Sequence, residues 1–499
     1  MSASEVRLQK RKIGAFYTPE GIFDKYILPK IEPLLWEYTW IDLYCGKGDL
    51  IIPIVKCINE DKRDLFVEQH IKCFDIDEKA LSIFKERLRN LNVKEEVIER
   101  SVVQMDTLEK FPDFSYVYPL YHITNPPYLY RGFIPKTEKT RELLKYFQGE
   151  REQLQDLYQV ALFNDVKKGI EKMIYIIPTN FLFGDANANY IRNFVLTRYR
   201  ITHLYILEEK VFPDTGTNTC ICFFEKKTMP SSEDQVVDAI KVSKGEEKHR
   251  IYRLTKKFKW RAGSEFYEFV EKFRAKTPIR FKFYLTKKEI EVCRGEHTVA
   301  LLDVNHYQPI TVSVNKQLYD KIKSNILFLK TLDTGRFEGR AGLYEHREIF
   351  NVDGIMVSKD YTYRTHPIQI FFENKLTPEE QKFVKHWFNI LLNKLRTYYD
   401  SDFMTTYREN TQYYTRKYLG IKQARMVLET CPLLDLEEKE KAFVLKLAKS
   451  DDIENLKRWI EKYLSAVEEK NKHDVKGQST LLEFISKESR AASRRILFD

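Results

Sequence analysis

Residues 41–50 read IDLYCGKGDL. An acid, Asp42, follows a short apolar run, and two glycines then lead into a second apolar run, LIIPIV (50–55). The pattern predicts a buried strand ending near Asp42, a tight turn at Gly46 and Gly48, and a helix after Leu50. Glycine allows backbone conformations that other residues avoid and lets the chain pass close to a ligand. A glycine-rich turn after the first strand is where open α/β sheets bind nucleotides. The spacing matches neither Gly-x-Gly-x-x-Gly nor a phosphate loop, so an ordinary tight turn is the alternative.

The first 227 residues alternate between strand-like and helix-like patterns. The strand-length runs are TWIDLY (39–44), IKCFDI (71–76), YHIT (121–124), MIYIIP (173–178), HLYIL (203–207) and CICFFE (220–225). Several are almost continuously apolar, as strands are when helices bury both faces of a parallel sheet. Helical patterns separate them, for example at 78–91 and 154–166. The alternation predicts an open, Rossmann-like α/β sheet with helices on both faces.

Three acids follow later strands of this series. Asp75 and Asp77 end the run IKCFDID, and Asp106 follows the short run VVQ. An acid at the end of the second strand can accept hydrogen bonds from ribose hydroxyl groups, and we expect Asp75 to have this role. Asp77 is expected to cap the next helix. Asp106 is suited to accept a hydrogen bond from an adenine amino group, and an ordinary loop acid is the alternative.

The segment Asn125-Pro126-Pro127-Tyr128 directly follows the run YHIT. Two prolines restrict the backbone and remove two N–H donors, so the segment is rigid and exposes its carbonyl groups. The side-chain oxygen of Asn125 and the carbonyl oxygen of Pro126 can each accept one hydrogen of a planar NH2 group. The Tyr128 ring can stack on the same plane. We therefore predict that these four residues are catalytic, the alternative being a rigid loop without chemistry.

The order of these motifs resembles that of the gamma-class amino-methyltransferases of restriction–modification systems, which act on adenine N6 in DNA. The resemblance implies an S-adenosyl-L-methionine-dependent enzyme that acts on a flipped base, without a metal, and a separate DNA target-recognition domain. It covers residues 13–227 well and the C-terminal part only loosely, most visibly at WFNILLNKLRTYY (387–399).

The resemblance also assigns roles to residues. GAFYTPEGIFDKYI (14–27) is similar to the family's N-terminal cofactor motif, which implies that Tyr17, Thr18 and Pro19 border the methionine part of the cofactor. The other cofactor-binding residues that it implies are Asp42, Gly46, Gly48, Asp75 and Asp106. VFPDTGTNTCICFF (211–224) resembles the motif whose aromatic residue stacks on the flipped base, so Phe212 would face that base opposite Tyr128. Lys47 departs from the family's turn, which binds mainly through its backbone.

The character of the sequence changes after Lys227, where TMPSSEDQ (228–235) forms a polar break that contains a proline. We predict a catalytic domain over 1–227, a mixed α+β target-recognition domain over 236–432 and a helical extension over 433–499. The extension contains two segments with apolar residues at helical spacing, which predicts two amphipathic helices packed on the preceding domain.

Basic residues are concentrated in the second part of the chain. Residues 248–288 contain fourteen Lys or Arg against three Glu, and aromatic residues lie between them. A run of this kind is often an ordinary solvated face, and the interleaved aromatic residues make a nucleic-acid surface an equal alternative. The candidate DNA-binding residues are Lys256, Lys257, Lys259, Arg261, Arg396 and Arg416.

The composition is that of a globular protein, with 43% hydrophobic and 31% charged residues and a net charge of +10. No run of about 18 apolar residues occurs, and the N-terminus lacks the apolar stretch of a secretory signal. Seven cysteines in apolar contexts are typical of reduced thiols. We therefore expect a cytoplasmic monomer that does not bind membranes.

These observations predict a site-specific, adenine-specific DNA methyltransferase, the modification enzyme of a restriction–modification system, with double-stranded DNA and a separate cognate restriction endonuclease as partners. Two alternatives remain. One is a methyltransferase with the same catalytic segment that acts on RNA or on a protein glutamine amide. The other is a non-catalytic DNA-binding subunit with the same fold.

Overall fold

The computed structural model describes residues 20–136, 138–185, 188–208, 218–243, 245–283, 287–302, 309–333, 340–351, 354, 356–357, 368–400, 402–409 and 415–474. The chain divides into two compact units, which we treat separately. Unit 1 comprises Met1–Ser264 with Asp402–Tyr418, and unit 2 comprises Glu265–Ser401 with Leu419–Asp499.

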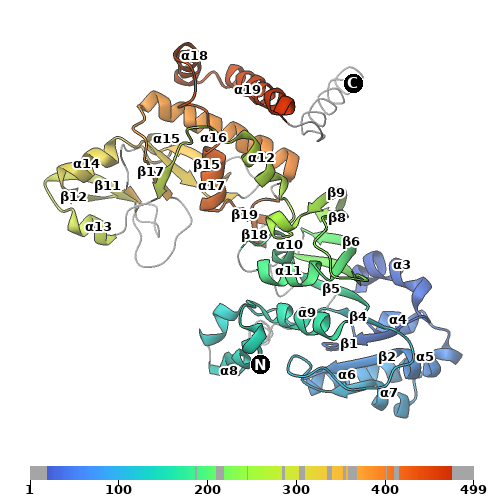
Figure 1. Cartoon of the computed structure of the whole chain (residues 1–499). Helices are drawn as coiled ribbons and strands as arrows, with labels where there is room; N and C mark the ends of the chain where they lie inside the picture. Colours follow the sequence, from blue (N-terminus) through green and yellow to red (C-terminus); the bar gives the residue numbers. More distant parts are fainter. Residues whose placement is uncertain are drawn as a thin grey trace. The chain divides into compact units, whose positions relative to one another are not determined.

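Unit 1 is built on a nine-stranded sheet with the order β3-β2-β1-β4-β5-β7-β6-β8-β9 (Figure 1). Its strands are β1 (Thr39–Asp42), β2 (Ile71–Asp75), β3 (Val102–Gln104), β4 (Leu120–Thr124), β5 (Lys172–Pro178), β6 (Tyr199–Leu207), β7 (Thr219–Lys226), β8 (Gln235–Ser243) and β9 (Glu246–Leu254). The first five strands in the order, β3 to β5, are parallel. β7 is antiparallel to both of its neighbours, β8 is parallel to β6, and β9 is antiparallel to β8. The predicted α/β sheet is confirmed.

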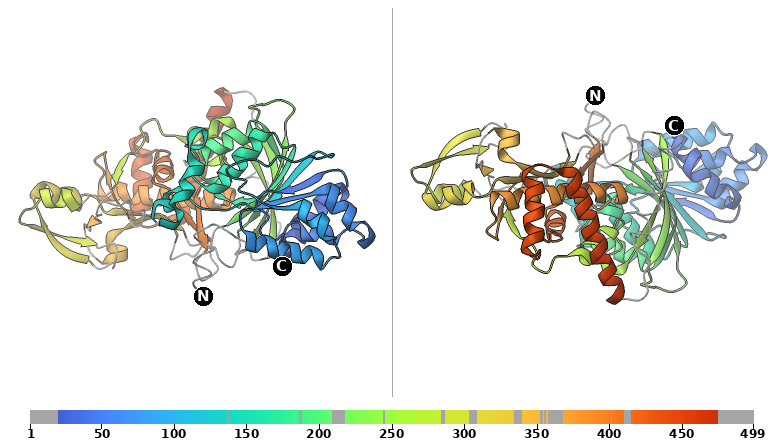
Figure 2. Two further views of the ribbon diagram at one scale, coloured as in Figure 1. Left: turned by 90° about the horizontal axis from the view of Figure 1, so that it is seen from below. Right: turned by 90° about the horizontal axis from the view of Figure 1, so that it is seen from above.

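Both faces of this sheet are buried along its central strands, which explains the continuous apolar runs in the sequence. On β5, Met173, Tyr175 and Ile177 belong to one core cluster, whereas Ile174 and Ile176 belong to the other. Helices cover each face (Figure 2). The helical elements are α2 (Glu20–Ile22), η1 (Phe23–Ile27), α3 (Leu28–Ile31), η2 (Glu32–Leu34), α4 (Ile52–Lys56), η3 (Glu60–Lys62), α5 (Arg63–His70), α6 (Glu78–Arg89), α7 (Glu95–Ser101), η4 (Arg131–Lys136), α8 (Glu138–Arg141), η5 (Glu142–Phe147), η6 (Gly149–Arg151), α9 (Leu157–Lys168), α10 (Asn180–Phe183), α11 (Asn189–Leu196) and η7 (Lys256–Phe258).

The sheet continues beyond the boundary that the sequence predicts. The break at 228–235 connects β7 to β8, and β8 and β9 extend the same sheet. Buried polar contacts join this hairpin to Asp402, which precedes β18 (Thr405–Glu409) and β19 (Thr415–Tyr418) in the same unit. The carboxylate of Asp402 accepts from Lys241 Nζ at 2.7 Å and from the Tyr252 hydroxyl at 2.8 Å. A polar loop therefore marks a turn within unit 1, and the division into units falls after Ser264.

Unit 2 has two small sheets, β10-β17-β13-β15 and β12-β11-β16. Its strands are β10 (Phe281–Phe283), β11 (His297–Leu302), β12 (Pro309–Val314), β13 (Leu327–Lys330), β14 (Leu332–Asp333), β15 (Gly342–Glu345), β16 (Met356–Val357) and β17 (Ile368–Phe372). Its helices are α12 (Glu265–Phe273), α13 (Lys287–Val292), α14 (Lys316–Lys323), α15 (His346–Phe350), α16 (Pro378–Tyr399), α17 (Ile421–Leu428), α18 (Glu438–Lys449) and α19 (Ile453–Asp474).

The long helix α16 begins with a capping box formed by Thr377 and Glu380, with Pro378 in its first turn. The two amphipathic helices expected near the end of the chain are α18 and α19. They pack on α16: the rings of Trp387 and Tyr463 lie 5.8 Å apart, and Lys441 forms a 2.7 Å ion pair with Glu380. Within the part of the chain that the structure describes, no helix combines the length and the apolar character needed to cross a bilayer.

Candidate active site

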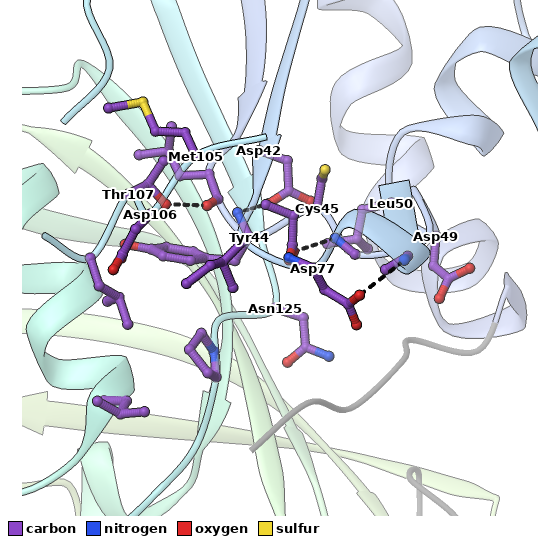
Figure 3. A pocket seen from close by; sticks show the side chains of 18 of the residues that line it. Asp42, Tyr44, Cys45, Asp49, Leu50, Asp77, Met105, Asp106, Thr107 and Asn125 are labelled. Atoms are coloured by element: carbon purple, nitrogen blue, oxygen red, sulfur yellow. Dashed lines mark hydrogen bonds between the residues drawn. The ribbon is translucent and has the colours of Figure 1, made fainter. Parts of the chain in front are cut away.

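A pocket of about 300 Å³ lies in unit 1 where β1, β2 and β4 end (Figure 3). It lies at the carboxyl ends of parallel strands, where open α/β sheets bind their ligands. Its lining residues are Asp42, Leu43, Tyr44, Cys45, Gly46, Asp49, Leu50, Asp75, Ile76, Asp77, Ala80, Met105, Asp106, Thr107, Leu108, Asn125, Pro127, Leu143, Tyr146 and Leu157. The pocket thus contains Asp42, Asp75 and Asp106, the three acids predicted to bind the cofactor, together with two residues of the Asn-Pro-Pro-Tyr segment.

The turn after β1 requires glycine at position 48. Gly46 and Gly48 have φ angles of 50° and 75°, in the left-handed region that favours glycine. A Cβ on Gly48 would lie 2.1 Å from the ring of Phe84 on α6. Gly46 lines the pocket, whereas Gly48 is absent from its lining. Gly48 therefore shapes the turn by packing it against α6.

Asp75 joins the ends of β1 and β2. One carboxylate oxygen accepts from the backbone N–H of Gly46 at 2.7 Å, and the other accepts from that of Asp77 at 2.8 Å. Burial raises the pKa of Asp75, and these two hydrogen bonds oppose the rise. Asp77 caps α6 by accepting from the backbone N–H groups of Lys79 and Ala80, as predicted.

A buried polar chain lies beneath the same turn. His122, on β4, accepts the N–H of Leu43 at Nε2 (3.2 Å) and contacts the Asp165 carboxylate at 2.5 Å through Nδ1. An Nε2 acceptor assigns the ring hydrogen to Nδ1, which then donates to Asp165. The neighbouring Asp42 is 2% exposed, and burial raises its pKa to about 7. The sequence pattern gave no sign of His122 or Asp165, because both are internal residues of predicted elements.

Asn125 and Pro127 face the pocket, and Tyr128 lies behind them, 9% exposed. The Tyr128 hydroxyl donates to the side-chain oxygen of Asn125 and lies 2.5 Å from the carbonyl oxygen of Ile176. The next residue, Leu129, donates its N–H to Asp156 at 2.9 Å, which joins the loop to the start of α9. Hydrogen bonds on both sides therefore restrain residues 125–128, in addition to the prolines.

The side of the pocket near Asp106 was not predicted beyond that residue. Tyr146, from η5, donates its hydroxyl to Asp106 at 2.6 Å, and Lys145 lies 3.4 Å from the same carboxylate oxygen. Burial, followed by the adjacent Asp106 carboxylate, raises the pKa of Tyr146, so its hydroxyl stays a donor at neutral pH. Leu143 and Leu157 add apolar surface. The sequence carried no motif signal for Leu143 and Tyr146, whereas Leu157 belongs to the helical pattern predicted at 154–166.

Several predicted residues lie outside the described part of the chain. These are Tyr17, Thr18, Pro19 and Phe212, together with the side chain of Arg416. Their assigned roles remain predictions. Pro126 lies between the two pocket-facing residues and is not part of the pocket lining.

The basic candidates fall into two groups. The side chains of Lys256, Lys257 and Lys259 are exposed on and beside η7. Arg261 is 2% exposed and donates to the carbonyl oxygen of Phe403 at 2.8 Å. In unit 2, Arg396 forms a 2.6 Å ion pair with Asp333, and its side chain is 11% exposed. The two arginines serve as internal donors, so among the candidates whose side chains the structure describes, the three lysines form the candidate phosphate-binding surface, which we call the η7 lysines.

Comparison with known proteins gives one family. The family model described as N-6 DNA Methylase matches residues 5–297. No curated protein matches the chain.

Solved structures that resemble parts of the chain include three from restriction–modification or DNA-bound proteins. A DrdV–DNA complex is 14% identical with a TM-score of 0.38, and the match covers 50% of this chain and 31% of that chain. A nuclease-deletion mutant of the Type ISP restriction-modification enzyme LlaGI with a DNA substrate mimic is 11% identical with a TM-score of 0.39, over 56% of this chain and 34% of that chain. A type I restriction-modification methyltransferase subunit from Streptococcus thermophilus is 17% identical with a TM-score of 0.32, over 48% of this chain and 50% of that chain. This chain therefore spans at most half the length of these three relatives.

Proposed function

The chain belongs to the N-6 DNA methylase family, and from this premise we propose that it transfers a methyl group from S-adenosyl-L-methionine to the N6 amino group of adenine in DNA. The observation that carries the proposal is the placement of Asn125 and Pro127 in the same pocket as Asp42, Asp75 and Asp106. An acceptor site for a planar amine thus adjoins a site with the groups that bind a nucleoside.

The residues of the pocket fit the cofactor. Five aspartates line it: Asp42, Asp49, Asp75, Asp77 and Asp106. Carboxylates accept hydrogen bonds from ribose hydroxyl and adenine amino groups, and their charge attracts a sulfonium cation. Asp75, which also fixes the Gly46 turn, is proposed to accept from the ribose, and Asp106 is proposed to accept from the adenine. When bound, the cofactor supplies an electrophilic methyl group on its sulfonium.

The chain's own residues would act on the target amine. The lone pair of an adenine amino nitrogen is delocalised into the ring, so the amine is a weak nucleophile. Acceptance of its two hydrogens by the Asn125 side-chain oxygen and the Pro126 carbonyl would increase the electron density on nitrogen. The hydrogen bond from Tyr128 fixes the orientation of the Asn125 amide before substrate arrives. Rate enhancement then comes from positioning and from preorganised acceptors.

The target base must leave the duplex to reach this pocket, which costs a few kcal/mol. Aromatic stacking by Tyr128 and Phe212 is proposed to offset part of that cost, since stacking contributes roughly 1–3 kcal/mol per base. The η7 lysines are proposed to bind DNA phosphates, and unit 2 is proposed to read the target sequence. A role as the modification enzyme beside a separate restriction endonuclease is part of the same proposal.

A comparison of three substrate classes tests the proposal. Purified protein with labelled cofactor is offered duplex DNA, RNA and a protein carrying exposed glutamine residues in separate reactions. We expect label only in DNA, recovered as N6-methyldeoxyadenosine. Label in RNA or in glutamine would assign the chain to another substrate class. Cofactor binding without transfer to any of the three would indicate a non-catalytic subunit.

A further inference from the structure

Asp106 is held in a defined orientation by the chain around it. Its Oδ2 accepts from the Tyr146 hydroxyl at 2.6 Å and lies 3.4 Å from Lys145 Nζ. Its Oδ1 accepts from the backbone N–H of Glu109 at 3.2 Å. The ammonium group of Lys145 is closer to Glu109, at 2.6 Å. A carboxylate has about four acceptor positions, so these contacts leave capacity for a ligand donor.

The backbone that carries Asp106 is fixed as well. The carbonyl oxygen of Leu108 accepts from Arg151 at 2.9 Å and from the Asn164 side-chain amide at 3.0 Å. Thr107 donates its hydroxyl to the carbonyl oxygen of Leu43, at the end of β1. The loop after β3 is thus attached to the end of the first strand, to η6 and to α9.

Tyr146 is the buried side chain that holds the Asp106 carboxylate, alongside the backbone N–H of Glu109. It is 4% exposed, lines the pocket and belongs to the core cluster that contains Phe147, Leu154 and Leu157. A packed ring places its hydroxyl group at one position. Lys145, in contrast, has a 46% exposed side chain, so its contact with Asp106 is weaker in water.

We propose that Tyr146 is a positioning residue that orients the Asp106 carboxylate toward the 6-amino group of a bound adenosine cofactor, and so makes the pocket selective for adenine. This inference rests on the proposed function and adds a specificity role for the segment between the catalytic tetrapeptide and α9. Tyr146 acts through Asp106, and the part of the ligand that it governs is the amino group alone.

The test measures binding with S-adenosyl-L-homocysteine and with its analogue in which hydrogen replaces the 6-amino group. Calorimetry gives the ratio of the two affinities for the wild-type protein and for Tyr146→Phe. We expect the wild type to prefer the amino ligand and Tyr146→Phe to lose about three- to tenfold of that preference, the range for one hydrogen bond. Affinity for the analogue should change little.

Two further variants make the result specific. Tyr199→Phe removes another buried tyrosine hydroxyl, which donates to the carbonyl oxygen of Ile170 and is not part of the pocket lining, and should leave the preference unchanged. Asp106→Asn should reduce the preference by itself, and adding Tyr146→Phe to it should have no further effect. An unchanged ratio of the two affinities in Tyr146→Phe would overturn the inference. If both affinities fall equally, the role of Tyr146 is merely structural.

The proposed function and this inference fail differently. If the wild type binds neither ligand, the cofactor assignment itself is refuted. If it binds both with equal affinity, Asp106 does not read the amino group and the inference is refuted. If it binds and discriminates while Tyr146→Phe discriminates equally well, the cofactor assignment stands and the role of Tyr146 is refuted.

Discussion

The side-chain oxygen of Asn125 accepts a hydrogen bond from the hydroxyl group of Tyr128, three residues later in the chain. The same hydroxyl lies 2.5 Å from the carbonyl oxygen of Ile176, on the central strand β5. A tyrosine hydroxyl has a single hydrogen. The two acceptor oxygens around it, on Asn125 and Ile176, confine the position of that hydroxyl group. Tyr128 thereby connects the orientation of the Asn125 amide to the sheet, in addition to the stacking role predicted from the sequence.

Tyr128→Phe should lower the turnover number about tenfold, which corresponds to ~1.4 kcal/mol in the transition state. The ring that is proposed to stack on the base remains, while the donor that orients Asn125 is lost. Cofactor affinity, measured by calorimetry, should stay within a few-fold of wild type. Tyr199→Phe is the matched control and should turn over normally. Wild-type turnover in Tyr128→Phe would show that the hydroxyl has no part in orienting the amide.

Asp75→Asn should weaken cofactor binding by about 10- to 100-fold, because a hydrogen bond to a charged group contributes roughly 1.5–3 kcal/mol. The variant also disturbs the acceptor of the Gly46 and Asp77 backbone N–H groups. Glu99→Gln, in an exposed ion pair with Lys85, is the control and should bind normally. Unchanged affinity in Asp75→Asn would remove Asp75 from the site.

The catalytic sheet could be predicted from the sequence because its signals are local. Buried parallel strands are apolar throughout, and the runs at 39–44, 71–76 and 173–178 all form strands of the sheet. The extension of the sheet by β8 and β9 could not be predicted. β8 alternates between buried and exposed residues, and its place beside β6 depends on long-range pairing that no local pattern specifies.

The candidate site shows the same limit. Asp42, Gly46, Asp75, Asp106 and Asn125 sit at strand ends or turns, where sequence position predicts proximity to a ligand, and all five line the pocket. The part of the wall formed by Leu143 and Tyr146 depends on how the irregular segment before α9 folds back onto the sheet. Arg261 shows the converse problem, since a basic residue in a basic run is indistinguishable by sequence from its exposed neighbours, yet it is buried.

Asp42→Asn should make the protein's stability less dependent on pH between about 4 and 7. Burial raises the pKa of Asp42 to about 7, above the ~3.9 of an unfolded chain, so the folded state binds the proton more tightly. The resulting contribution to stability is complete below pH ~4 and is lost as the pH rises through about 7. The unfolding temperature should fall less between pH 5 and pH 8 in the variant than in the wild type. Burial also raises the pKa of Asp156 to about 7, so part of the loss of stability between these two pH values should remain in the variant. A decrease as large as that of wild type would contradict the account.

Replacing the η7 lysines Lys256, Lys257 and Lys259 by Gln should weaken DNA binding at low salt and flatten its salt dependence. Each lost phosphate contact should reduce the slope of log affinity against log salt by about 0.9. Sequence preference should persist, because phosphate contacts position the protein and base contacts specify the site. The charge-matched control replaces the exposed Lys56, Lys62 and Lys94. If both triple variants show the same slope as wild type, the η7 lysines are a solvated surface.

The most direct measurement compares wild type with Asn125→Ala in two assays on the same preparations. Methyl transfer is followed with labelled S-adenosyl-L-methionine on amplified genomic DNA, which offers many unmodified target sequences, and the digested nucleosides are then identified. Cofactor affinity is measured by calorimetry. We predict that wild type produces N6-methyldeoxyadenosine, and that Asn125→Ala produces none detectable while binding the cofactor within a few-fold of wild type. Wild-type turnover in Asn125→Ala, or labelled product other than N6-methyldeoxyadenosine from the wild type, would contradict the assignment of Asn125 as the acceptor for an adenine amine.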